Sequence, residues 1–562
     1  MSGKLHIVLH SHLPYVMGHG TWPHGTDWLF EASAETYIPL LIAFKGLEQR
    51  GIPFRMSIGL TPILCEQLSN RHFTGSFEAY LEQKIIDARQ NREVFFATGE
   101  RELCALAEMW EREYFKIKEF FDRELKKDII GGFKALQDDG RIEIITCAAT
   151  HGYLPLLGSD EAVRAQIFTG VKSYENHFGR RPRGIWMPEC AYRPAYNWKP
   201  PVGEGAAFDR HGVEEILDEA GIEWTVADSH LLVGGESQGV YIDRFESLRA
   251  LWSRFAESYV PPKLDSERTT LRPYIVSSTG RPAGTAFFFR DPETGLQVWS
   301  AEWGYPGNPA YLDFHKKHFP GGHRYWRITD AKADLADKKI YNPEWIERAL
   351  DEQATHFVSI VKKRIEGGGV LTAPFDAELF GHWWWEGPRW LAKVAEKIAE
   401  TQGIEMTSGS TALEEFPPEE VINIPEGSWG QGGFHYIWLN EWTEWTWKHI
   451  YKAEARMTSL VQRWIETGRP PEIAEPMKQA GRELLLLESS DWQFLISTWS
   501  ARDYAETRLT FHYNAFNKLA EAIERILDGG STSTEERTRY RLLAEQDCPF
   551  QDIDLELWAR KK

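Results

Sequence analysis

Residues 184–194 read Gly-Ile-Trp-Met-Pro-Glu-Cys-Ala-Tyr-Arg-Pro, a short apolar run that stops at a proline and a glutamate. Residues 184–187 predict a buried strand. Pro188 cannot extend its hydrogen-bond ladder, so the carboxylate of Glu189 is expected where the strand leaves the sheet. In barrels of alternating strands and helices, that end carries the active site. We therefore predict that Glu189 is catalytic; the alternative is a carboxylate that only pairs with Arg193 or caps a turn.

A second stretch, residues 372–386, shows the same pattern of a strand that is followed by a carboxylate. It reads Thr-Ala-Pro-Phe-Asp-Ala-Glu-Leu-Phe-Gly-His-Trp-Trp-Trp-Glu and continues from a strand predicted at 369–372. Asp376 therefore also follows a strand. Two strand-end carboxylates favour an active site more than one does, because a pair can act as acid and base or nucleophile.

Strand-like runs alternate with helical patterns over most of the first 406 residues. This alternation predicts an α/β fold with a parallel sheet, and the polar groups after several strands predict that the sheet closes around a common mouth. The expected strands are 4–9, 54–60, 142–146, 184–187, 223–227, 369–372 and 404–406.

Two excursions interrupt the alternation. Residues 191–228 are rich in Pro, Gly and aromatic residues around one helix and predict a small inserted helical domain. Residues 231–320 contain a hairpin pattern, 285–289 with 296–299, and long excursions of this kind usually form lids or substrate-binding loops.

These patterns predict three domains. We expect a catalytic barrel formed by 1–190 and 229–410, with an extended lid loop near 231–275, and the inserted domain between its two parts. Residues 411–562 are expected to form a C-terminal helical domain that contributes to the substrate groove. Its helical patterns are at 453–467, 471–488, 502–527 and 534–546.

Composition narrows the class of protein. The 562 residues are 42% hydrophobic and 26% charged, enough for a large core. No apolar run approaches the roughly 18 residues that span a bilayer, and no signal-type segment opens the sequence, so we expect a cytoplasmic protein. The formal net charge of −19 argues against nucleic-acid and membrane partners and favours a neutral substrate. Five scattered cysteines support neither a disulfide framework nor a cysteine zinc site.

Tryptophan is frequent, with 24 in 562 residues, and many stand next to Gly, Glu or His. Aromatic faces stack on sugar rings, so this composition is typical of a carbohydrate groove, although about half of the tryptophans are expected in the core. His10 and His12 end the first strand and point to the same side. Such a pair can hold a metal or act as neutral hydrogen-bonding groups for sugar hydroxyls. We favour the second and expect no metal, because no cysteine or acidic cluster completes a metal shell.

Five motifs follow one another along nearly the whole chain. They are His-Ser-His-Leu-Pro-Tyr at 10–15, Ala-Thr-His-Gly-Tyr-Leu-Pro at 149–155, Trp-Met-Pro-Glu-Cys-Ala-Tyr-Arg-Pro at 186–194, Phe-Asp-Ala-Glu-Leu-Phe-Gly-His-Trp-Trp at 375–384 and Asp-Trp-Gln-Phe-Leu at 491–495. With them the chain resembles glycoside hydrolase family 57, and within it the 1,4-α-glucan branching enzymes. The resemblance implies an incomplete (β/α)7 barrel with a small inserted domain and a C-terminal α-helical domain. It also implies Glu189 as nucleophile and Asp376 as general acid/base, with neither metal nor cofactor.

The same resemblance implies which residues hold an α-glucan. The inner subsites would be lined by His10, Trp22, His151 and Trp384, and His12 joins them by its place beside His10. The rest of the glucan chain would be bound by Arg290, Gly307, Trp429, Asp491 and Gln493, with stacking expected for Trp429 and hydroxyl bonds for Asp491.

A mobile loop of the family carries a tyrosine associated with branching. Tyr241 is the predicted equivalent, with Tyr259 and Tyr274 as alternatives. The segment between Gly234 and Tyr274 is longer than we expect for branching enzymes, and an altered loop would favour hydrolysis over transfer.

The acceptor decides the reaction that the resemblance implies. A 6-hydroxyl of a glucan chain gives an α-1,6 branch, water gives an amylase, and a 4-hydroxyl gives a 4-α-glucanotransferase. Two other classes stay open: a non-catalytic glucan-binding protein, and a metal-dependent polysaccharide deacetylase using His10, His12, Asp228 and His230. We expect a monomer or homodimer that acts on amylose or a glycogen-like polymer in glycogen biosynthesis.

Overall fold

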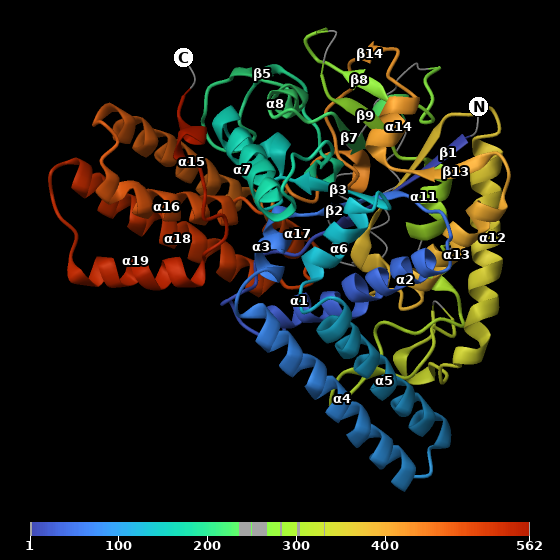
Figure 1. The fold of residues 1–562 in the computed structure, drawn as a ribbon. Helices are drawn as coiled ribbons and strands as arrows, with labels where there is room; N and C mark the ends of the chain where they lie inside the picture. The colour runs from blue at the N-terminus through green and yellow to red at the C-terminus, as the bar shows by residue number, and fades with distance from the viewer. Residues whose placement is uncertain are drawn as a thin grey trace.

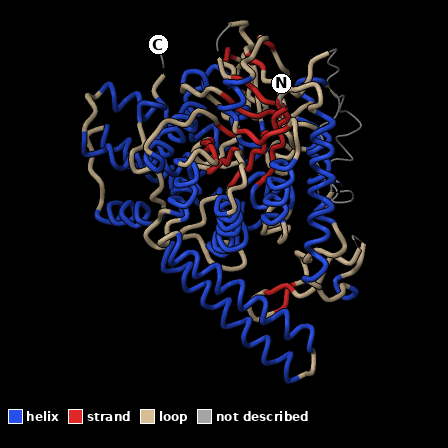
Figure 2. Tube along the Cα trace, turned by 45° about the vertical axis from the view of Figure 1, so that its right-hand side comes forward, coloured by secondary structure: helices blue, strands red, loops and turns tan. Residues whose placement is uncertain are grey.

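The centre of the molecule is a ring of parallel strands. The computed structural model describes residues 3–234, 249, 267–281, 284–299, 304–330 and 332–560. Within these ranges the ring has seven strands, β1 (Gly3–Ser11), β2 (Met56–Leu60), β3 (Ile142–Cys147), β4 (Ile185–Trp186), β7 (Trp224–Ala227), β9 (Ala286–Phe289) and β12 (Val370–Asp376). In Figure 2 the strands gather at the upper centre, with helices around them.

Pairing closes this ring. Parallel ladders join β12, β1, β2, β3 and β4 in that order, and another joins β7 to β9. Single parallel bridges from Gly184 to Trp224 and from Arg290 to Thr372 connect β4 with β7 and β9 with β12. The result is a (β/α)7 barrel, one strand short of the common eight. The expected fold class is therefore confirmed.

The strands are apolar because both of their faces are covered. β2 and β9 are buried along their whole length, and β1 is buried at all but one position. A parallel strand between the barrel interior and the outer helices has no solvent side, so its sequence is a continuous apolar run. The strands expected at 4–9, 54–60, 142–146, 184–187, 223–227 and 369–372 are confirmed as ring strands.

The seventh ring strand is not the expected one. β13 (Ile404–Thr407) pairs only with the first residues of β1, whereas β9 takes the seventh place in the ring. We predicted that residues 285–289 and 296–299 form a hairpin, and that prediction is wrong, because the second segment belongs to a helix. The side chain of Asp291 accepts a hydrogen bond of 2.9 Å from the backbone N–H of Thr294, so the Asp-Pro pair starts the helix α11 (Pro292–Trp299) instead of a β-turn.

Helices cover the outside of the ring. Those of the barrel are α1 (Thr26–Ala32), α2 (Ile38–Gln49), α3 (Pro62–Leu68), α6 (Ile129–Asp138), α7 (Asp160–Phe178), α9 (His230–Val233), α12 (Ile346–Arg364), α13 (Gly387–Glu400) and α14 (Gly409–Glu415). The pair α4 (Phe73–Ala97) and α5 (Arg101–Glu119) forms a helical hairpin that projects from the barrel at the bottom of Figure 1.

Small sheets stand beside the ring. The antiparallel pair β5 (Tyr196–Trp198) and β6 (Phe208–Arg210) is followed by α8 (Val213–Glu219). β8 (Tyr274–Val276) and β14 (Val421–Ile422) extend the edge of β9, and β10 (Lys317–His318) pairs with β11 (His323–Arg324). The strand β7 lies within residues 191–228, the range predicted for the inserted domain, but it belongs to the ring. The boundaries of the inserted domain stay a prediction.

The C-terminal part is helical, as predicted. Its helices are α15 (Glu444–Glu466), α16 (Ala474–Leu487), α17 (Asp491–Thr498), α18 (Arg502–Leu527) and α19 (Thr534–Gln546). The sequence patterns did not predict α17, which lies between the helical domain and the barrel in Figure 1. Among the described helices, none combines the length and the apolar character needed to cross a membrane.

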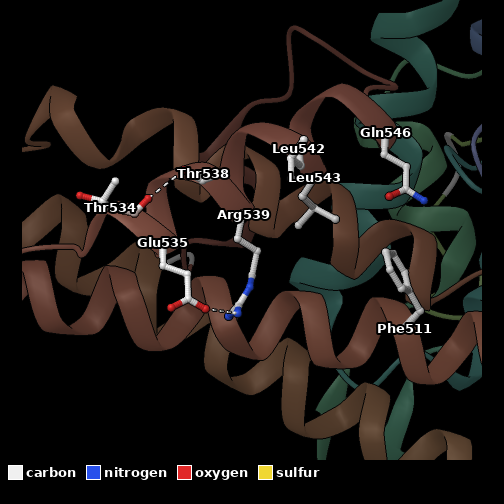
Figure 3. A pocket seen from close by; sticks show the side chains of 8 residues that line it. All are labelled: Phe511, Thr534, Glu535, Thr538, Arg539, Leu542, Leu543 and Gln546. Atoms are coloured by element: carbon white, nitrogen blue, oxygen red, sulfur yellow. Dashed lines mark hydrogen bonds and ion pairs between the residues drawn. The ribbon is translucent and has the colours of Figure 1, made fainter.

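The helical domain also has a hollow of about 620 Å³ between α18 and α19, shown in Figure 3. Leu542, Leu543 and Phe511 form its apolar part, and Glu535 pairs with Arg539 at its rim. None of the predicted site residues lines this hollow.

Candidate active site

Glu189 lies immediately after β4, in the short turn Pro188–Cys190. Its backbone has φ 60°, a left-handed conformation that is strained for a residue with a side chain and is found mainly at functional sites. The indole N–H of Trp429 donates to Oε2 of Glu189 at 2.7 Å, and the backbone N–H of Trp429 donates to the carbonyl of Glu189 at 3.1 Å. Arg193 faces Asp160 and the carbonyl of Pro194, so the alternative of a Glu189–Arg193 pair is not observed.

Asp376 is the last residue of β12 and lies in register with His10 at the end of β1. The charge of Asp376 acts on Glu189, and both carboxylates follow ring strands that end at the mouth of the barrel. Burial raises the pKa of Glu189 to about 8; the bond from Trp429 opposes this, and the charges of Asp376 and Asp491 reinforce it. A raised carboxyl pKa in a pair of carboxylates is the electrostatic signature of an acid/base site.

A stack of imidazoles forms one wall of the site. Nε2 of His10 lies 3.1 Å from Nε2 of His151, and the rings of His12 and His151 are stacked with centroids 3.9 Å apart. Trp186 of β4 stacks on the other side of His10 at 4.6 Å. Burial holds the pKa of both His10 and His151 well below the usual value, so these rings are neutral and can exchange hydrogen bonds with hydroxyl groups.

Asp491 reaches this wall from the helical domain. It is the first residue of α17, and its Oδ2 accepts a bond of 2.9 Å from Nε2 of His12 and one of 2.6 Å from the hydroxyl of Ser489. Burial alone would raise the pKa of Asp491, but the charge and bond of His12 lower it below the ordinary value. A residue of the helical part of the chain thus contacts the candidate site, whereas its contribution to a substrate groove stays a prediction.

Glu378 is a site residue that we did not predict. Its Oε1 accepts bonds from the hydroxyl of Tyr37 at 2.6 Å and from the backbone N–H of His12 at 3.1 Å. Burial raises its pKa to about 8, and the charge of Asp376 acts in the same direction. Its place two residues after Asp376 was the only signal in the sequence.

A second polar network follows β7 and β9. Arg290 donates from Nη1 to Oδ2 of Asp228 at 3.2 Å, and His230 Nδ1 lies 2.9 Å from Oδ1 of the same carboxylate. Burial would raise the pKa of Asp228, but its bonds with His230 and the charge of Arg290 hold it well below the usual range. Burial raises the pKa of the Cys190 thiol well above its usual value, and the charges of Asp228 and Glu189 act in the same direction.

Other predicted residues lie differently from the expectation. Trp429 is 4% exposed, so it offers Glu189 a hydrogen bond and little face for a sugar to stack on. Trp384 is buried among Tyr311, Phe380 and Trp390, and Gln493 is buried and donates to Thr446. These two have no surface toward a glucan in this structure.

The remaining predictions concern loops. Trp22 is 72% exposed in the loop before α1, and Gly307 ends a short turn whose Tyr305 packs on Trp390. Tyr241 and Tyr259 lie outside the described residues. Tyr274 is in β8, where its hydroxyl accepts bonds from Thr269 and Arg272, so it is held in a sheet.

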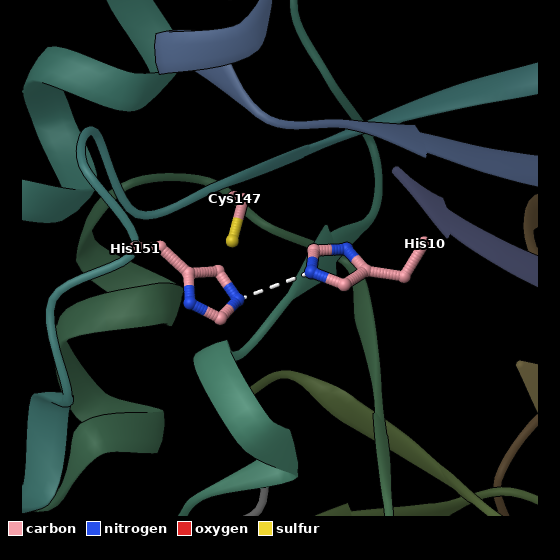
Figure 4. A group of neighbouring side chains, drawn as sticks. All are labelled: His10, Cys147 and His151. Carbon is pink, nitrogen blue, oxygen red and sulfur yellow. Dashed lines mark hydrogen bonds between the residues drawn. The ribbon is translucent and has the colours of Figure 1, made fainter. Parts of the chain in front are cut away.

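The described residues contain few groupings with the spacing of metal ligands. His10, Cys147 and His151 form one at the mouth, shown in Figure 4, and His12, His151 and Asp491 form another. Asp228 and His230 belong to neither: they bond to each other, Asp228 accepts from Arg290, and Nε2 of His230 bonds the carbonyl of Gly433. The four ligands proposed for a deacetylase are therefore split between two networks.

A parallel barrel with two partly buried carboxylates at the carboxyl ends of its strands is an arrangement that retaining glycoside hydrolases use. The family model for glycosyl hydrolase family 57 matches residues 6–425, and that for the C-terminal part of 1,4-alpha-glucan branching enzymes matches residues 449–558. The chain therefore belongs to glycosyl hydrolase family 57 and, within it, to the group of the branching enzymes.

Individual relatives agree with this placement. A 1,4-alpha-glucan branching enzyme of Thermococcus kodakarensis is 43% identical over 561 residues, which are 98% of this chain and 78% of the relative. The crystal structure of a family 57 branching enzyme from Pyrococcus horikoshii has a TM-score of 0.88 at 39% identity and covers 100% of this chain and 98% of that one. The alpha-amylase AmyC of Thermotoga maritima has a TM-score of 0.80 at 30% identity and covers 100% of both chains.

Proposed function

We propose that this protein is a 1,4-α-glucan branching enzyme that cleaves an α-1,4 bond with retention and transfers the chain to a 6-hydroxyl. The observation that carries the proposal is the pair of carboxylates, Glu189 and Asp376, that follow β4 and β12 at the mouth of the barrel, where burial and the charge of Asp376 raise the pKa of Glu189. The similarity to a 1,4-alpha-glucan branching enzyme supports it. The substrate proposed is a neutral α-glucan such as amylose or a glycogen-like polymer. The net charge of −19 supports this, because such a surface repels anionic polymers.

The proposed first step is displacement at the anomeric carbon. Asp376 donates a proton to the glycosidic oxygen while the ionised carboxylate of Glu189 attacks, which gives a covalent glucosyl-enzyme. In the second step Asp376, now ionised, removes the proton of the acceptor hydroxyl. The neutral rings of His10 and His151 and the carboxylate of Asp491 are placed to hold sugar hydroxyls beside the pair.

This mechanism needs one proton on the pair of carboxyl groups. Burial raises the pKa of Glu189, whereas attack requires its ionised form and a proton on Asp376. Because two interacting carboxyl groups titrate as a unit, the position of the proton depends on their partners. The bond from Trp429 favours the ionised form of Glu189 and is therefore the contact that prepares the nucleophile.

Hydrolysis is the second candidate, since the alpha-amylase of Thermotoga maritima shares the whole fold. The two reactions differ only in the acceptor. A closed site that excludes water and admits a second chain favours branching. We further propose a cytoplasmic role in glycogen biosynthesis that needs no cofactor.

One experiment tests the proposal. The purified protein is incubated with amylose, and the α-1,6 anomeric proton signal and the release of reducing ends are recorded on the same sample. A growing α-1,6 signal with few new reducing ends is expected. Reducing ends without α-1,6 linkages would establish an amylase instead. Glu189→Gln should lower either activity by about 10⁴-fold with an unchanged circular dichroism spectrum, and substantial residual turnover would refute the role of Glu189.

A further inference from the structure

An exposed tryptophan, Trp499, and a partly buried one, Trp442, form a pair at the C-terminal end of α17. Trp499 is 55% exposed and has φ 58°, a left-handed backbone at a residue with a large side chain. The ring of Trp442 lies 5.4 Å from it, centroid to centroid, at an angle of 47°. Exposing a strained indole costs free energy on two counts, because the ring loses burial and the backbone is held in an unfavourable region. An exposed aromatic side chain on a strained backbone is therefore a candidate for ligand binding.

Hydrogen bonds fix the backbone segments that carry the two rings. The buried side chain of Asn440 accepts from the backbone N–H of Trp442 at 2.9 Å and donates to the hydroxyl of Ser497 at 2.8 Å. Ser497 in turn donates to the carbonyl of Ile437 at 2.6 Å. The loop that carries Trp442 is thereby locked to α17, which ends at Trp499. A platform that is held in place before binding loses little entropy when a ligand arrives.

The two segments that carry Trp442 and Trp499 also contain residues that contact the proposed active site. The segment that ends at Trp442 contains Trp429, which donates to Glu189, and the helix that ends at Trp499 begins with Asp491, which bonds His12. Eight residues of helix place Trp499 about 12 Å beyond Asp491 along the axis of α17. A polymer that leaves the site along α17 would meet these two rings next.

The chemistry of the pair fits a sugar chain better than a protein. Two indoles expose at most about 500 Å², less than the roughly 800 Å² that each partner buries in a stable protein interface. The guanidinium of Arg502, which donates from Nε to Glu506 at 2.8 Å, lies over the Trp499 ring at 5.5 Å from its centre and brings a hydrogen-bonding group to the aromatic pair. Aromatic faces next to fixed donors are what a glucose unit requires.

We propose that Trp442 and Trp499 form a binding platform for a distal part of an α-1,4-glucan chain, outside the subsites next to Glu189 and Asp376. The proposal rests on an α-glucan as the substrate but is independent of which acceptor is used. The platform gives long chains an additional contact that short oligosaccharides cannot reach. It therefore makes the enzyme prefer long chains.

Binding to catalytically inactive protein tests the platform directly. In a Glu189→Gln background, Trp442→Ala and Trp499→Ala should each weaken binding to amylose by about three- to tenfold, measured by affinity electrophoresis in gels that contain amylose. In the active enzyme, the ratio of kcat/KM for amylose to that for a short maltooligosaccharide should fall by a similar factor. Trp499→Phe should retain most of the affinity, because a ring remains.

Trp345 offers a matched control. It is 51% exposed, and the guanidinium of Arg327 lies 5.4 Å from its ring, yet it is the residue before α12. In Figure 1 the helix α12 lies on the side of the barrel away from the helices α15 to α19. Trp345→Ala should leave amylose binding unchanged. Equal effects of Trp345→Ala and Trp499→Ala would overturn the proposal.

Two further outcomes are informative. If size-exclusion chromatography shows that Trp442→Ala or Trp499→Ala changes the oligomeric state while amylose binding persists, the rings belong to a protein interface and the proposal is wrong. If the wild type hydrolyses amylose without forming branches, the proposed function fails, but the loss of binding in the inactive variants still supports the platform. Thermal unfolding of each variant checks that the fold is retained.

Discussion

Trp429→Phe removes the hydrogen bond from Trp429 to Glu189 and keeps an aromatic ring at this position. The bond has an N to Oε2 distance of 2.7 Å, and Glu189 is only partly buried, so solvent replaces the lost donor incompletely. A hydrogen bond to a charged group contributes about 1.5–3 kcal/mol. Because that bond favours the ionised carboxylate, its loss should raise the pKa of Glu189 by about one to two units.

The expected consequence is a shift of the pH profile. Attack requires ionised Glu189, whose pKa is about 8 in the wild type. The acidic limb of kcat/KM should therefore move to higher pH, and the rate at pH 7 should fall by about 10- to 100-fold. The assay is the initial rate of α-1,4 cleavage on amylose between pH 5 and pH 10.

A neighbouring tryptophan provides the control. Trp186 packs 5.0 Å from Trp429, and its indole N–H has no hydrogen-bond partner within the described part of the chain. Trp186→Phe should perturb packing but leave the acidic limb in place. If Trp429→Phe leaves the limb where it is or moves it to lower pH, the bond does not prepare the nucleophile and the reasoning is refuted.

Two predictions concern stability. The pKa of Glu378 in the folded protein is about 8, well above the ordinary value for a carboxyl group. Between the ordinary value and pH 8, the folded state therefore keeps a proton that the unfolded state has lost. The free energy of unfolding should fall as the pH rises through this range. Glu378→Gln should flatten this part of the profile in urea unfolding from pH 5 to pH 9; an equally steep decline would contradict the buried proton. Arg290→Met should lower the free energy of unfolding by about 3 kcal/mol at pH 7 by leaving Asp228 without its cation. Asp228 has a lowered pKa, so its contribution is present above the unfolded pKa and is lost as the pH falls through the folded value. The deficit of Arg290→Met should therefore shrink in acid, and Asp228→Asn with Arg290→Met should recover part of it; a deficit that is constant with pH would show that Arg290 acts through packing alone.

Most of the barrel could be predicted from local patterns. Apolar runs identified the ring strands up to β7 and again at β12, and Pro188 marked where β4 ends and Glu189 begins. The strand at 286–289 was recognised as extended, but its partner was not. A β-turn and a helix start can share Asp291-Pro292, and only the packing of α11 against the barrel distinguishes them.

The sequence by itself determined the two strand-end carboxylates and the alternation that brings them to one mouth, because strand periodicity and a proline stop act within a few residues. The tertiary structure alone decided which groups surround them. His12 meets Asp491 from a helix far along the chain, Trp429 meets Glu189 by its N–H edge, and Glu378 becomes buried beside Tyr37. Burial and charge act through space, so the raised pKa of Glu189 and its cause exist only once the barrel and the helical domain have packed together.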